Sequence, residues 1–301
     1  MDTTANVARG FWDFWTPLRI VGLMIVLMMA GIGLWSLHAR RLERAEAALN
    51  PAIEEGLAAL ERGDIGPAAA RLSVAVDAMN LIGQHDRYSA SVRQAYREAR
   101  ALDNLSSEPL LTILEQADDV VEKAVRSRRR AKPSGNNDGD EPPPLDADWI
   151  NKFAALYEGG WVVMEAPVRR LSPTEKEPRR FVVEFPIGIG SSQHAVELRA
   201  DFEVFEQLNV DKKAQSVIFG GQLQSMRFDE PRGIWKVRLS LESGFLWTGA
   251  ATYRRLGFRY SEWHPQEAVE AQLARQAQAL QVDVLIEGPS PSTPSLPVET
   301  P

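Results

Sequence analysis

The chain has 301 residues, a formal net charge of −7, a charged fraction of 25% and no cysteine. The length leaves room for one or two domains, and the ordinary charged fraction excludes wholesale disorder. The lack of cysteine excludes disulfides, thiolate metal sites and cysteine nucleophiles. The mild acidic balance argues against general nucleic-acid binding, which needs a concentrated basic face.

The clearest feature is an uncharged apolar run from Ile20 to Leu37. At about 1.5 Å per residue it forms a helix of roughly 27 Å, close to the thickness of the hydrocarbon core. A cleaved signal peptide is the alternative, but Arg40 and Arg41 follow the run as a stop-transfer flank. We therefore predict a tail with an aromatic belt over residues 1–19 and a transmembrane helix over 20–37 that contacts the lipid bilayer.

The side of the membrane follows from the flanking charges. Arg40, Arg41 and Arg44 follow the apolar run, whereas Arg9 and Arg19 precede it. The positive-inside rule then favours a cytoplasmic body, with the envelope side as the alternative. The composition, rich in alanine and arginine, suggests a bacterial chain, so we expect a single-pass protein of the bacterial inner membrane.

A helical region is expected over residues 39–132. Its best-marked part is the segment EEGLAALERGDIGPAAARLSVAVDAMN, residues 54–80. Small residues would let two antiparallel helices approach closely, and Gly63-Asp64 would form the turn between them. The segment resembles one tetratricopeptide repeat, with Gly56, Ala59, Gly63, Ala68, Leu72 and Ala75 at that family's packing positions. Ala52 stands where the family usually has an aromatic residue, and no second copy follows. The resemblance therefore implies a helical hairpin and not a superhelix.

Two further helices complete the expected bundle, one from Tyr88 to Leu105 and one from Pro109 to Val125, the latter with a 3.6-residue apolar period. Arg128, Arg129 and Arg130 then either complement the end of the helix dipole or contact anionic lipid if the body is cytoplasmic. Residues 133–145 are rich in Gly, Asn, Asp and Pro, which predicts a disordered linker.

Residues 146–287 switch to period-2 alternation, as in the segment from Val196 to Val204. This pattern predicts an antiparallel β-domain, either a meander or a sandwich, with flanking helices. Gly220-Gly221 is expected to form a bulge and Phe245 to Tyr253 a strand. The remaining residues 288–301 are expected to be a disordered tail. The whole chain is thus expected to be an α+β multidomain protein.

We find no catalytic motif, so we expect that the protein is not an enzyme. The sequence indicates neither a cofactor nor a metal ion. The histidines His38, His85, His194 and His264 lack the spacing of metal ligands. One group of arginines and aromatic residues could hold an anionic, flat ligand, although an edge strand guarded by arginines would have the same composition. It comprises Tyr253, Arg254, Arg255, Arg259, Tyr260, Trp263 and His264.

Three functions fit these features. The first is a membrane-anchored, non-enzymatic binding or scaffold protein that presents both modules to a protein partner, as a monomer or a homo-oligomer. The second is an envelope receptor whose β-domain binds a small molecule, a glycan or a peptide. The third is an enzyme without a recognisable motif, which a polar pocket with His194 or His264 beside a carboxylate would favour.

Overall fold

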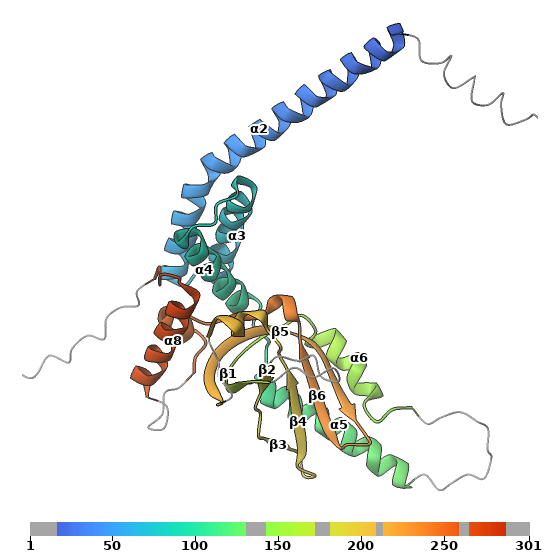
Figure 1. Cartoon of the computed structure of the whole chain (residues 1–301). Coiled ribbons are helices and arrows are strands. Elements are labelled where there is room, and N and C mark those ends of the chain that lie inside the picture. The colour runs from blue at the N-terminus through green and yellow to red at the C-terminus, as the bar shows by residue number, and fades with distance from the viewer. Residues whose placement is uncertain (1–16, 131–142, 172–180, 209–212, 259–264, 287–301) are drawn as a thin grey trace, which may run out of the picture.

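The computed structural model describes residues 17–130, 143–171, 181–208, 213–258 and 265–286. Within these ranges the chain is a mixed α+β protein in which a long apolar helix leads into a helical hairpin and then into a curved sheet (Figure 1). Most of the expected N-terminal tail, most of the linker and the whole C-terminal tail lie outside the described residues.

The first helix, α2 (Pro17–Arg62), has 46 residues and is therefore about 69 Å long. Its N-terminal part is long and apolar enough to cross a membrane, and none of the apolar window is buried by the rest of the chain. Met24 and Trp35, for example, are 65% and 72% exposed. The apolar segment does not end in a loop, because the same helix continues into the helical hairpin.

The end of α2 forms the predicted helical hairpin with α3 (Ile65–Ile82), and α4 (Arg87–Asp103) packs beside α3. Gly63 closes the turn with a φ of 91°, a left-handed conformation that glycine adopts without strain. A Cβ on Gly56 would lie 2.8 Å from Cγ of Leu72, so the two helices approach closely at this point. The small residues of the hairpin thus allow the close approach of the two helices, as the sequence pattern predicts.

The next helix, α5 (Leu110–Arg130), packs differently from the expected bundle. Its apolar stripe, which includes Ile113, Leu114 and Val121, belongs to the same hydrophobic core as the sheet and α6 (Ala147–Leu156). The 3.6-residue period shows that one face of a helix is buried but not which surface covers it. The linker predicted over residues 133–145 stays a prediction.

The sheet has the strand order β2-β1-β5-β6-β4-β3, and β7 also pairs with β5. The strands are β1 (Trp161–Arg170), β2 (Phe181–Val183), β3 (Gly188–Ile189), β4 (His194–Arg199), β5 (Gln215–Asp229), β6 (Ile234–Leu239) and β7 (Phe245–Leu246). The prediction of a purely antiparallel sheet is wrong, because β4 runs parallel to β6. Period-2 alternation reports which face of a strand is buried and carries no information on its direction.

Short helices complete the fold: η1 (Glu203–Leu208), η2 (Leu241–Ser243), α7 (Ala250–Arg254) and α8 (Gln266–Leu280). The strand expected from Phe245 to Tyr253 is therefore cut short, and its second half is helical. The expected bulge at Gly220-Gly221 is also absent, since both glycines pair in register with β1 and the register shift lies between Leu223 and Ser225.

The two glycines have a packing role instead. A Cβ on Gly220 would lie 2.6 Å from the ring of Phe245, and one on Gly221 would lie 2.8 Å from the ring of Phe202. The missing side chains thus let two buried aromatic rings lie directly against β5.

Candidate functional site

The position of α4 is fixed by a buried carboxylate. Glu98 is 2% exposed, and its Oε1 accepts hydrogen bonds from the backbone N–H of Thr248 at 2.8 Å and of Gly249 at 3.1 Å. The hydroxyl of Thr252 and the side-chain amide of Gln94 also donate to this carboxylate. These contacts join α4 to the chain that follows the sheet, so α4 is held firmly against it.

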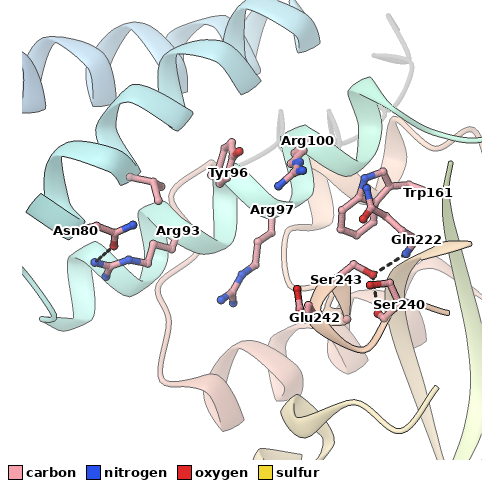
Figure 2. A pocket seen from close by; sticks show the side chains of 12 residues that line it. Asn80, Arg93, Tyr96, Arg97, Arg100, Trp161, Gln222, Ser240, Glu242 and Ser243 are labelled. Atoms are coloured by element: carbon pink, nitrogen blue, oxygen red, sulfur yellow. Dashed lines mark hydrogen bonds between the residues drawn. The ribbon is translucent and has the colours of Figure 1, made fainter. Parts of the chain in front are cut away.

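A different face of α4 carries three arginines. Arg93, Arg97 and Arg100 lie at positions i, i+4 and i+7 and therefore form one stripe about 10 Å long. They line a half-open cleft of about 530 Å³ between α4 and the sheet (Figure 2). The other lining residues are Val76, Asn80, Tyr96, Trp161, Gln222, Ser240, Glu242, Ser243 and Gly244.

The opposite wall is a hydrogen-bonded corner of the sheet. The Ser243 hydroxyl accepts a bond from the N–H of Gln222 at 2.8 Å and donates one to the carbonyl of Ser240 at 2.8 Å. Ser240 in turn donates its N–H to the carbonyl of Gln222. Because its polar groups bind one another, this wall is preformed. Glu242 projects from it towards the same space as Arg97 (Figure 2).

Trp161 stands at the junction of the two walls. It is 4% exposed, and its backbone N–H donates to the carbonyl of Asn104 just after α4 at 2.9 Å. Its ring packs edge-on against Phe245, with the ring centroids 5.6 Å apart. Within the described residues its indole N–H has no hydrogen-bond partner.

The three arginines differ in how they are held. Arg93 donates to the side-chain oxygen of Asn80 at 3.2 Å and to the carbonyl of Gln84 at 2.7 Å, so its side chain is fixed. No partner for the guanidinium of Arg97 or of Arg100 is found in the part of the chain that the structure describes. The pKa of Arg97 is lowered below its usual value, mainly because the guanidinium has lost part of its surrounding water and to a smaller extent because Arg93 repels it.

The chemistry of the cleft follows from these charges. Three guanidinium groups and one carboxylate line it, so the cleft is positive although the whole chain is negative. Guanidinium groups bind carboxylates and phosphates through paired, charge-assisted hydrogen bonds. The cleft can therefore hold a ligand with two or more anionic groups.

The group predicted from the sequence lies elsewhere. Tyr253 is buried beside Phe258, and Arg254 donates to the carbonyl of Ala250 in its own helix. Arg255 donates to the carbonyls of Leu60 and Glu61 at 2.9 and 2.8 Å and so caps the end of α2. The remaining members, Arg259, Tyr260, Trp263 and His264, lie outside the described residues. The three described side chains thus face different partners.

The sequence analysis missed the arginine stripe, although a signal for it exists. The segment RQAYREAR places three arginines on one helical face. The prediction of this helix used only the residues of its apolar face and therefore did not include the arginines. The opposite wall comes from residues more than a hundred positions away, and no local pattern could have paired it with this helix.

No protein-family model matches the chain, and comparison with curated proteins and with solved structures finds no match either. The resemblance of residues 54–80 to a tetratricopeptide repeat therefore stays a prediction.

Proposed function

We propose that this protein is a membrane-anchored, non-enzymatic binding protein whose arginine-lined cleft receives an acidic segment of a partner protein. The observation that carries the proposal is the pair Arg97 and Arg100, whose charges face a preformed cleft without a partner among the described residues. Both side chains are exposed and line the cleft, so their guanidinium groups are available to form charge-assisted hydrogen bonds with an anionic occupant.

A protein segment fits the cleft better than a compact small molecule does. The cleft is half open, and its arginines are arranged in a line. The rise along α4 is about 6 Å from Arg93 to Arg97 and about 4.5 Å from Arg97 to Arg100. Side chains on the same side of an extended strand repeat every 6–7 Å or so, which is close to this spacing. Alternate acidic residues would thus meet successive arginines.

The membrane anchor would determine where in the cell the cleft binds its partner. An apolar helix at the start of α2 would hold the cleft near a membrane, where the partner would be found. We keep the proposal of a bacterial inner membrane and of a cytoplasmic body, with the envelope receptor as the alternative. Because one chain supplies both walls of the cleft, the proposed binding does not require a homo-oligomer.

The test uses the full chain in phosphatidylcholine nanodiscs and a fluorescent decapeptide of alternating glutamate and serine. We expect saturable binding by fluorescence anisotropy, weakening with added salt, and no binding of the matched glutamine–serine peptide. The double variant Arg97→Gln/Arg100→Gln should bind about tenfold or more weakly. Arg71→Gln is the matched control, because Arg71 forms an exposed ion pair with Glu55 on the hairpin, away from the cleft. Equal affinity of the double variant and the control would refute the proposal, and preference for a compact phosphorylated molecule would favour the receptor.

A further inference from the structure

A second cleft contains a histidine that is oriented by a buried carboxylate. Asp118 of α5 is 1% exposed, and one of its oxygens, Oδ1, lies 2.7 Å from Nδ1 of His194. The same oxygen accepts a hydrogen bond from the indole N–H of Trp235 at 2.9 Å. Because an ionised carboxylate only accepts, the ring proton of neutral His194 lies on Nδ1 and the lone pair on Nε2.

The second cleft has a volume of about 380 Å³ and is distinct from the arginine-lined one. It lies between the C-terminal half of α5 and the turns that follow β3 and β5. Its polar lining consists of Glu122, Arg126, Arg129, Ser191, Ser192, His194 and Glu230. The charged members of this lining are Glu122, Arg126, Arg129 and Glu230, and Asp118 lies behind the histidine.

The two acidic residues of this lining are already paired. Glu122 accepts from the N–H and hydroxyl of Ser191 and from Arg126 at 2.7 Å, and these contacts lower the pKa of its carboxyl. Glu230 pairs with Arg128 at 3.0 Å. In the described part of the chain Arg129 has no such partner. The cleft therefore presents a hydrogen-bond acceptor on the histidine together with an available cationic donor.

We propose that this cleft is a phosphate-binding site in which Nε2 of His194 accepts a hydrogen bond from the P–OH group of the ligand and Arg129 donates to its anionic oxygens. Monohydrogen phosphate carries one hydroxyl donor together with anionic acceptor oxygens. Carboxylates and sulfate carry acceptors alone near neutral pH, so their oxygens would face the lone pair of neutral His194. The donor and acceptor pattern of the cleft thus selects phosphate.

A histidine beside a carboxylate in a polar pocket is also the arrangement that would favour an enzyme. The contacts of His194 leave a hydrogen-bond acceptor, Nε2, beside the arginine of the cleft. The C-terminal end of α5, which lines the cleft, lies at the end of the molecule opposite the apolar part of α2 (Figure 1), which favours a soluble phosphate over a lipid headgroup of the same membrane.

The test follows the four histidines of the full chain in phosphatidylcholine nanodiscs, labelled with ¹³C at Cε1 and assigned by single His→Gln variants. At about pH 8, where histidine side chains are ordinarily neutral, inorganic phosphate should shift the His194 signal saturably and sulfate of equal ionic strength should not. A response of the signal to phosphatidic acid in the nanodisc but not to the free ion would assign the same site to a lipid headgroup.

Variants of the neighbouring arginines distinguish phosphate binding at this site from a purely structural role of His194. Both Arg129 and Arg130 are exposed, but only Arg129 lines the cleft. Arg129→Gln should therefore weaken phosphate binding about tenfold, whereas Arg130→Gln should leave it unchanged. Equal shifts of the His194 signal by phosphate and sulfate, or equal affinities of the two arginine variants for phosphate, would overturn the proposal. Binding of the acidic peptide to the other cleft should be unaffected by Arg129→Gln, so the two proposals can fail independently.

Discussion

Glu98 accepts hydrogen bonds from both the backbone N–H and the hydroxyl of Thr248, at 2.8 and 2.9 Å, across 150 residues of chain. Both residues are buried, so neither can replace these bonds with water. The contact fixes α4 to the chain beyond the sheet and thereby sets the width of the arginine-lined cleft.

We predict that Glu98→Ala lowers the free energy of unfolding by about 3 kcal/mol, because several buried donors lose their acceptor at once. Chemical denaturation followed by circular dichroism measures this change. Glu61→Ala, at an exposed position of α2, should change it by less than about 0.5 kcal/mol. Similar effects of the two substitutions would show that the Glu98 network contributes little.

Gly220→Ala should destabilise the protein by about 1–3 kcal/mol, because its Cβ would overlap the ring of Phe245. The matched background is Phe245→Leu, whose smaller side chain leaves room for the methyl group. In a double-mutant cycle the glycine substitution should cost clearly less in that background. Additive costs would contradict the proposed overlap.

The start of α4 should depend on pH through Asp86. Its carboxylate accepts from the side chain of Gln84 at 2.9 Å and from the N–H of Ser89 at 2.7 Å, and these bonds lower the pKa of Asp86 below 3.8. A carboxyl whose pKa is lower in the folded state stabilises above its unfolded pKa and loses this effect as pH falls through the folded value.

Asp86→Ala should therefore reduce the thermal midpoint at neutral pH, and the difference from the unmodified chain should shrink steadily as the pH falls below 3.8. The control is Asp77→Ala on the exposed face of α3, which should show a small difference at every pH. A difference for Asp86→Ala that stays constant down to the lowest pH would argue against a role of the charged carboxylate.

The anchor makes a separate prediction. Full-length protein should stay in the membrane fraction after carbonate and high-salt washes, because burial of an apolar helix is insensitive to both. A chain that begins at Arg40 should be soluble and should retain the hairpin, since the core positions of α2 start near Ala45. Release of the intact chain by salt alone would contradict membrane insertion.

The orientation is tested by fusing reporters after Pro301. We expect a reporter that fluoresces only in the cytoplasm to be bright, because Arg40, Arg41 and Arg44 resist translocation. A dark fusion together with an active periplasmic reporter at the same point would place the body in the envelope.

The sequence predicted the helices better than the sheet, for physical reasons. The turn at Gly63 and the stripe of α5 follow from local spacing, which a helix expresses within a few residues. The parallel pairing of β4 with β6 and the cap that Arg255 places on α2 depend on contacts between distant segments. Of the arginine-lined cleft, the stripe on α4 could have been read from the sequence, whereas the wall at Gln222 and Ser243 could not.

The continuity of α2 has a mechanical consequence. Helical backbone runs from Leu37, at the end of the apolar segment, to Arg62 in the hairpin, over about 37 Å. A transmembrane helix commonly tilts by about 20°, and such a tilt would move the hairpin sideways by about 13 Å. The thickness of the surrounding bilayer would then change where the hairpin lies over the membrane, since the continuous helix, which contains Pro51, carries a change of its tilt to the hairpin.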